Sequence, residues 1–143
     1  MNLFSFCTGL LLFGCVSYSL EAQTLSKSHN VVTGTYTYRI DAESLEQLGD
    51  TICFDPRSAS QFPYPRQPDD LRLRWFCFTN TDKAKRMLRI PTAAKIKECG
   101  LQGQATVEID KYQTGNEDTD DFDVAHLVAV RYVSDIEPLL CSR

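Results

Sequence analysis

Two stretches of the chain alternate between apolar and polar side chains with a period of two residues. In residues 32–40, aliphatic, glycine and tyrosine positions alternate with threonine and arginine, and residues 103–112 repeat the pattern around Ala105, Val107 and Ile109. Successive side chains of a β-strand point to opposite faces, so this alternation predicts two strands with one buried face each. Gly34, within the first stretch, predicts a bulge or a tight bend in that strand.

Weaker patterns predict the remaining elements. Residues 83–90 carry apolar side chains at helical spacing and end before Pro91, which predicts a short helix. The proline-rich residues 56–70 are expected as a loop, and the acidic residues 41–50 as a linker with room for a helical turn. Three further strands are expected over residues 51–55, 71–79 and 124–133, the second of them central because both of its faces are partly apolar.

The resulting order is three strands, one helix and two strands. The stretch from Gly103 to Ile109, followed by residues 123–130, resembles the fourth and fifth strands of an OB-fold, a five-stranded Greek-key barrel. The resemblance covers most of residues 31–133, rests on topology and hydrophobic rhythm, and is to small exported bacterial OB-fold proteins. It implies one OB-like barrel over residues 31–143 and binding rather than catalysis, and the polar residues 23–30 are expected as a lead-in to this domain. A cystatin-like or lipocalin-like sheet is the alternative, and would require a longer helix or more strands.

The N-terminal segment is apolar, and residues 3–16 are shorter than the ~20 residues that a spanning helix needs. This predicts a secretory signal peptide over residues 1–22, with cleavage after Ala22 or, alternatively, after Ser19. The stretch from Leu12 to Cys15 also resembles a bacterial lipobox, in which Cys15 would become the lipidated first residue. Both interpretations place the protein in the periplasm or cell envelope, or outside the cell, and a lipid on Cys15 would be its membrane contact.

Cleavage after Ala22 leaves four cysteines, namely Cys53, Cys77, Cys99 and Cys141. An even number behind an export signal predicts two disulfides, for which three pairings are possible. Cys53–Cys77 is favoured because both residues lie in strands expected to be neighbours. Cys99–Cys141 would then fix the C-terminus to the start of a later strand. A zinc site is disfavoured because the chain has no CxxC pair and little histidine.

Charge is sorted along the chain, although the formal net charge is only −4. Residues 66–97 hold nine basic and three acidic side chains, whereas residues 98–123 hold eight acidic side chains and one basic. In an OB-like barrel the loops after the first strand and before the fifth flank the ligand groove. Here the carboxylates in those loops predict an anionic rim that attracts a basic protein and repels nucleic acid. The rim residues are Asp41, Glu43, Glu46, Asp50, Glu117, Asp118, Asp120, Asp121 and Asp123.

The sequence predicts a non-enzymatic binding protein without a cofactor, similar to an immunity protein or an enzyme inhibitor. It contains no GxSxG, P-loop or dinucleotide motif, and His126 is expected as a half-buried packing residue of a strand. Phe62 and Tyr64, in the proline-rich loop, are expected as apolar anchors for the partner. The alternative is a small-ligand or calcium-binding module, with residues 118–123 as oxygen ligands. That run lacks the glycine and terminal glutamate of an EF-hand loop.

Overall fold

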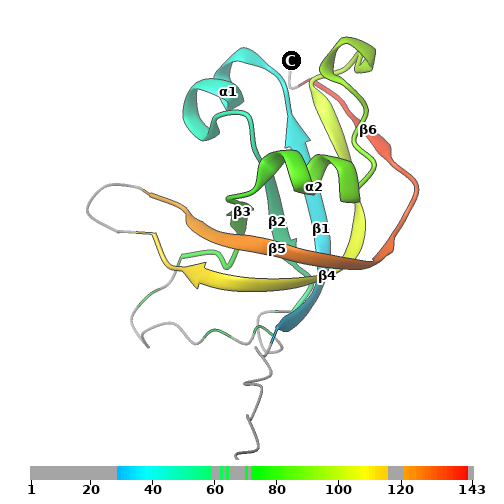
Figure 1. Ribbon diagram of the computed structural model, residues 1–143. Coiled ribbons are helices and arrows are strands. Elements are labelled where there is room, and N and C mark those ends of the chain that lie inside the picture. Colours follow the sequence, from blue (N-terminus) through cyan, green and yellow to red (C-terminus); the bar gives the residue numbers. More distant parts are fainter. Residues whose placement is uncertain are drawn as a thin grey trace, which may run out of the picture.

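The computed structural model describes residues 29–58, 62, 64, 70, 72–115 and 121–141. The predicted leader, with Cys15, and most of the polar lead-in lie outside these residues. The described chain is mainly β (Figure 1), and its elements follow in the order β1 (Asn30–Arg39), α1 (Ala42–Leu48), β2 (Ile52–Pro56), β3 (Phe76–Phe78), α2 (Thr81–Met87), a short 3-10 turn (Ala93–Lys95), β4 (Gly100–Gln113), β5 (Asp123–Val133) and β6 (Glu137–Leu139).

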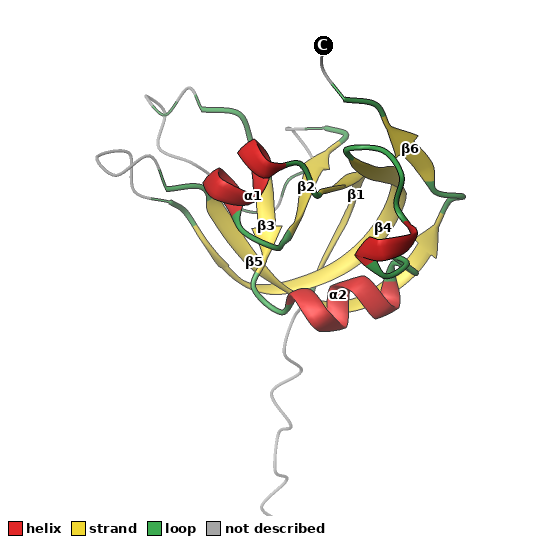
Figure 2. Cartoon of the chain, turned by 90° about the horizontal axis from the view of Figure 1, so that it is seen from above, coloured by secondary structure: helices red, strands yellow, loops and turns green. Residues whose placement is uncertain are grey.

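The six strands form one sheet in the order β1-β2-β3-β5-β4-β6, and an additional β1–β4 pairing closes the first five strands into a ring. Neighbouring strands are antiparallel except β3 and β5, which are parallel. Three register shifts interrupt the β4–β5 ladder. Such irregularities bend and twist a strand, which lets the long β4 curve around the ring. Seen from above, the strands curve around the core, and α1 and α2 lie on different sides of the ring (Figure 2).

The apolar side chains of the alternating strands fill the inside of this ring. Val32, Tyr36 and Tyr38 of β1 are buried, as are Val107 and Ile109 of β4, so the predicted alternation is confirmed. Burying one such large side chain stabilises the fold by roughly 1.5–3 kcal/mol. An aromatic cluster completes the core between β2 and β3, and its members are Phe54, Phe76 and Phe78.

Gly34 allows β1 and β2 to approach closely. A Cβ atom at this position would lie 2.1 Å from the backbone oxygen of Asp55, a distance that no side chain can occupy. The β1–β4 ladder continues in unbroken register through Gly34, and the β1–β2 ladder ends there, opposite Pro56. The glycine therefore serves close strand packing, where the sequence pattern predicted a bulge or bend.

The third strand is shorter than predicted, because only Phe76–Phe78 pair with neighbouring strands. Residues 72–75, directly before it, belong to no strand. The backbone N–H and the guanidinium of Arg72 donate hydrogen bonds to Asp70, and the side chain of Leu73 is 80% exposed. The strand is central, as predicted, since it lies between β2 and β5.

The predicted helix before Pro91 is present as α2, displaced by two to three residues toward the N-terminus. Its Ala84 is buried, and so is Leu88 at its C-cap; both pack against the core of the ring. Asn80, at the N-cap, makes no side-chain cap hydrogen bond. Its amide instead exchanges two 2.9 Å hydrogen bonds with the backbone of Leu127, which attach the start of the helix to β5.

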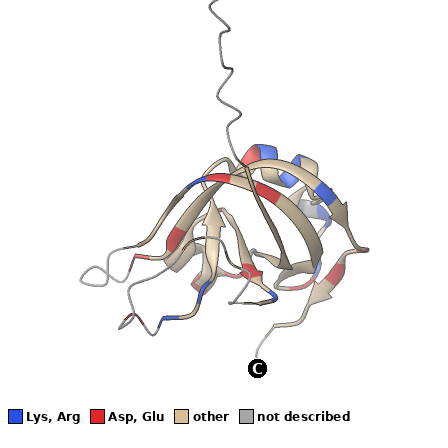
Figure 3. Cartoon of the chain, turned by 90° about the horizontal axis from the view of Figure 1, so that it is seen from below, with Lys and Arg blue, Asp and Glu red and all other residues tan. Residues whose placement is uncertain are grey.

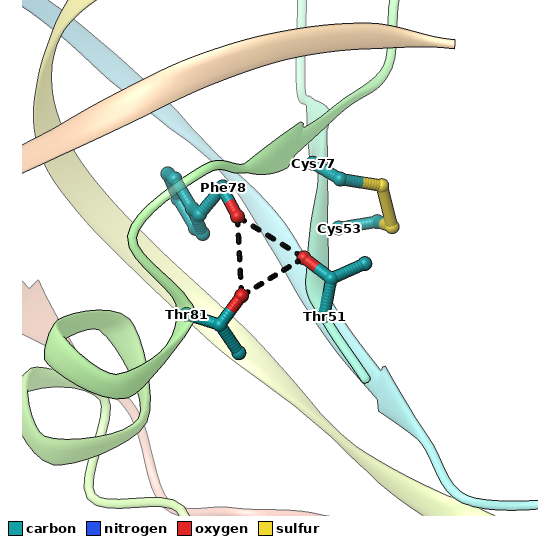
Figure 4. The surroundings of a disulfide bond; sticks show 5 residues. All are labelled: Thr51, Cys53, Cys77, Phe78 and Thr81. Carbon is teal, nitrogen blue, oxygen red and sulfur yellow. Dashed lines mark hydrogen bonds between the residues drawn. A yellow bond between two sulfur atoms is a disulfide. The ribbon is translucent and has the colours of Figure 1, made fainter. Parts of the chain in front are cut away.

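Two disulfides, Cys53–Cys77 and Cys99–Cys141, are present with the favoured pairing. Cys53 and Cys77 lie directly opposite each other in the β2–β3 ladder (Figure 4). Cys141 lies just after β6, which pairs with the start of β4. Two disulfides indicate an oxidising, extracellular type of environment. Within the described part of the chain, neither helix has the length and apolar character needed to cross a membrane.

Candidate functional site

A groove of about 600 Å³ lies on the outer surface of the ring over β1 and β2. Because Tyr36, Ile52 and Phe54 point into the core, the alternate residues Thr37 and Cys53 face outward and form part of the groove floor. Small-molecule and cofactor sites have volumes of about 300–1,000 Å³, so the groove has the size of a ligand site.

Two segments from different parts of the chain form the walls. One wall is α1 with the residue after it, represented by Ser44, Leu48 and Gly49. The other is the segment before β3, which contributes Leu73, Arg74 and Trp75. The indole of Trp75 stacks on Phe122, with ring centroids 5.7 Å apart, so the segment leading into β5 borders this wall. Both loops that the sequence predicts to flank a groove therefore lie beside the same one.

The groove carries more positive than negative charge. Among its described lining residues are the arginines Arg39, Arg57 and Arg74, together with one carboxylate, Asp55. The Arg39 side chain is 40% exposed and lies 3.9 Å from Asp41. Arg57 is exposed and donates a 3.4 Å hydrogen bond to the side chain of Gln104. Guanidinium groups bind carboxylate and phosphate oxygens through paired hydrogen bonds, so this lining favours an anionic ligand.

Covalent and hydrogen bonds fix the floor of the groove. The Cys53–Cys77 disulfide links β2 to β3, and the hydroxyl of Thr51 donates to the backbone oxygen of Phe78 at 3.1 Å (Figure 4). The hydroxyl of Thr81 lies 3.4 Å from both of these oxygens. A floor held in this way is organised before a ligand arrives, which lowers the entropic cost of binding.

In the first acidic loop, two of the four predicted carboxylates have structural roles. The backbone N–H of Ser44 donates to Asp41 and so caps α1, which holds the pKa of Asp41 below its ordinary value. Asp50 accepts hydrogen bonds from Lys85 and from the hydroxyl of Tyr38, and these lower the pKa of Asp50. The other two, Glu43 and Glu46, are exposed on α1.

In the second acidic loop, Asp123 belongs to the interior. It is 2% exposed and accepts hydrogen bonds from the hydroxyl of Tyr112 and from the backbone N–H of Gly115. It is therefore not part of an exposed rim, because its carboxylate anchors the start of β5. Asp121 is exposed, whereas Glu117, Asp118 and Asp120 lie outside the described residues. Within the part of the chain that the structure covers, no three acidic, histidine or cysteine side chains are grouped to hold a metal ion.

Phe62 and Tyr64 extend the core rather than forming exposed anchors. Phe62 is 6% exposed and packs on Phe76 and Tyr112, with centroid distances of 6.0 and 5.1 Å. Tyr64 stacks on Tyr112 at 4.4 Å, and its hydroxyl accepts a 2.6 Å hydrogen bond from Asn30. The proline-rich loop thus turns its aromatic side chains inward, because burying them removes a large apolar area from water.

His126 has the half-buried position in β5 that the sequence predicts, with its Nε2 atom 3.3 Å from the Asn80 amide nitrogen. What sequence reasoning missed is the groove itself, because its arginines come from three separate segments. The available signal was the polar, outward face of the first strand, which ends in Arg39. Comparison with protein-family models, with curated proteins and with solved structures finds no match for this chain.

Proposed function

We propose that this chain is an OB-fold binding protein that performs no chemistry and contacts a partner protein through the groove over β1 and β2. The ring order β1-β2-β3-β5-β4, the parallel β3–β5 pair and the helix between β3 and β4 support the OB-fold assignment. OB-folds bind ligands on the face of their second and third strands, between the loop after strand one and the loop before strand five.

The observation that carries the proposal is the position of the groove between these two loops. α1 lies in the first loop and forms one wall, and Phe122 of the second loop stacks on Trp75 in the other. Half of the described lining residues are arginine, threonine or leucine, and three of them are arginines. Arginine keeps its proton at all physiological pH values, so these groups bind and orient a partner rather than transfer protons.

Export through a signal peptide or a lipoprotein signal is part of this proposal. The apolar N-terminal residues and the two disulfides support a periplasmic, cell-envelope or secreted location. Mass spectrometry of the protein purified from its source distinguishes the two signals. A mature chain that begins at Gln23 or Leu20 supports a signal peptide, and an acylated Cys15 supports a lipid anchor.

Filling the groove tests the binding function. Thr37→Trp places a large ring on the groove floor, and Thr106→Trp places the same ring on an outward-facing position of β4 that does not line the groove. We expect captured protein from the source organism to be lost with Thr37→Trp and retained with Thr106→Trp. If Thr37→Trp captures the same protein as the unchanged chain, the groove is not the contact surface.

A basic partner bound at the acidic loops is the second candidate function, as for an immunity protein or enzyme inhibitor. Glu43 and Glu46 are exposed on α1, which has no basic residue in its last turn, and Asp121 is exposed in the second loop. Changing these three residues to their amides should weaken the binding of a cationic partner at low salt. Calorimetry with Ca²⁺ tests the remaining possibility that the segment 118–123 binds calcium.

A further inference from the structure

We infer that the groove recognises an acidic polypeptide segment in an extended conformation. In this inference, carboxylates of the segment bind Arg39 and Arg57, and an apolar side chain between them packs on Leu48 and Leu73. The inference rests on the proposed function and adds the chemistry of the partner. It also predicts a negatively charged partner, whereas the acidic loops alone predicted a positively charged one.

The positions of two arginines set the length of the segment. Arg39 ends β1, whereas Arg57 lies beside Thr33, because the Arg57 backbone N–H donates to the Thr33 oxygen at 2.9 Å. Residues 33 and 39 are six positions apart on one strand, which corresponds to about 20 Å of extended chain. The backbones of the two arginines therefore lie at opposite ends of the groove floor, and the Arg57 guanidinium extends from its end to Gln104 of β4. An extended segment of about six residues, with a carboxylate near each end, spans this distance.

The middle of the groove is suited to an apolar side chain. Leu73 is 80% exposed on one wall, and Leu48 lies on the other. An exposed leucine that faces a second leucine across a groove of ligand size offers apolar contact area to a bound side chain. Arg74 follows Leu73 directly, so charged and apolar contacts alternate along this wall.

Side chains must carry the recognition, because the strand edges below the groove are occupied. β1 pairs with β2 and β4, and β2 pairs with β1 and β3. A ligand cannot add to these strands through its main chain, as peptides do at an open sheet edge. Arginine pairs with a carboxylate through two parallel hydrogen bonds, which supplies both affinity and orientation.

A single-stranded nucleic acid fits this surface less well. Such ligands require aromatic faces on which bases stack and a continuous positive track for their phosphates. Trp75 stacks on Phe122, which covers one face of the indole ring. Asp55 is exposed on the floor between the arginines, and Glu43 and Glu46 are exposed on the α1 wall. These carboxylates interrupt the positive track and repel evenly spaced phosphates.

Trp75, the only tryptophan of the chain, lines the groove and reports on binding by its fluorescence. The purified oxidised protein is titrated with a capped hexapeptide that has glutamate at both ends and leucine in the middle. The same peptide is also made with glutamine, or with lysine, in place of glutamate. A thymidine oligonucleotide is the fourth probe. We expect saturable binding of the glutamate peptide, at least tenfold weaker binding of the glutamine peptide and none of the lysine peptide.

The double variant Arg39→Gln with Arg57→Gln should bind the glutamate peptide at least tenfold more weakly. Its matched control is Arg86→Gln with Arg89→Gln, which removes two exposed positive charges from the region of α2 and should stay within twofold. The inference is overturned if both double variants bind alike, or if the glutamate peptide gives no saturable signal. It is also overturned if the glutamine or lysine peptide, or the oligonucleotide, binds as tightly as the glutamate peptide. If one of these results is obtained but Thr37→Trp still loses the captured protein, the groove remains the contact surface. The proposed function is then supported, and only the acidic nature of the partner is wrong.

Discussion

At the scale of single residues, Asp50 shows how a carboxylate in an acidic loop becomes part of the fold. Both of its oxygens accept hydrogen bonds from Lys85, at 2.6 and 2.8 Å, and one of them also accepts from the hydroxyl of Tyr38. The Lys85 ammonium lies 4.7 Å from the centre of the Tyr38 ring. α2 supplies this partner because its charged side chains are mainly basic (Figure 3). The three groups join α2 to β1 and to the loop before β2.

The same three groups shift one another's titration. The hydrogen bonds from Lys85 and Tyr38 hold the pKa of Asp50 below its ordinary value of 3.8. Burial raises the pKa of Tyr38. Burial also lowers the pKa of Lys85, but the hydrogen bonds and charges of Asp50 and Tyr38 outweigh it and leave that pKa raised.

Asp50→Asn should therefore destabilise the protein in a pH-dependent way. The folded-state pKa of Asp50 is lowered, so its stabilisation is present above pH 4 and is lost as the pH falls through the folded-state value. The Asp50 side chain is 63% exposed, which limits the expected cost to about 1 kcal/mol at pH 7. Urea unfolding at pH 7 and below pH 4 measures it, with Glu46→Gln on α1 as the control. A difference that stays constant down to pH 2 would contradict the role of the charge.

Arg89→Gly should stabilise the protein by about 1 kcal/mol. Arg89 has a φ of 60°, a left-handed conformation that costs residues other than glycine roughly 1–2 kcal/mol. It ends the α2 region, where the Arg89 N–H donates to Arg86 and the Ile90 N–H donates to Lys85, as in a helix end closed by glycine. The control Arg86→Gly puts glycine inside the helix and should cost about 1 kcal/mol. Thermal unfolding of both variants measures these changes in stability. Equal changes in the two variants would refute the backbone argument.

At the scale of elements, the Cys99–Cys141 disulfide holds β6 against the start of β4. Changing both cysteines to serine should cost about 2–4 kcal/mol, because the bond closes a loop of 42 residues in the unfolded chain. We expect hydrogen exchange to show loss of protection in β6 and retained protection in β1, β2 and β5. The matched control, Cys53→Ser with Cys77→Ser, opens a loop of 24 residues and should weaken β2 and β3 instead. Loss of protection throughout the ring in the first variant would mean that β6 is required for closure.

The elements that could be predicted are those whose buried side chains recur at regular intervals in the sequence. β1 and β4 bury every second side chain, so their sequences alternate, and α2 shows helical spacing because it packs Ala84 and Leu88 on the core. α1 has no buried side chain and therefore has no apolar period to detect. The apolar pattern of β3 extends further than its pairing, because Arg72 binds Asp70 instead of continuing the strand.

The candidate site was harder to predict because charge in a sequence does not show which carboxylates find partners. Asp50 lies in the loop before β2 and Asp123 is the first residue of β5, yet Lys85 binds the first carboxylate and Tyr112 binds the second. The partner of Asp50 lies 35 residues away, and Arg39 and Arg57 come to line one groove only after β1 and β2 pair. Long-range pairing creates the site, whereas local sequence shows only its parts.

At the scale of the whole molecule, folding depends on joining β1 to β4. Their nearest paired residues, Arg39 and Gly100, are 61 positions apart in sequence. Chains dominated by such distant contacts fold on the millisecond-to-second timescale. We expect this range for refolding of the disulfide-intact protein, followed by the fluorescence of Trp75 in stopped flow. A signal that is complete within microseconds would contradict closure of the ring as the slow step.

The closed ring also determines how copies of this protein meet one another. Each of its five strands has a hydrogen-bonded neighbour on both sides, and the sixth, β6, is three residues long and contains Pro138, which lacks an N–H donor. Open strand edges are the templates on which proteins aggregate, and short edges with proline protect against it. At high concentration, molecules of this protein therefore offer one another little open strand edge for backbone hydrogen bonding into fibres.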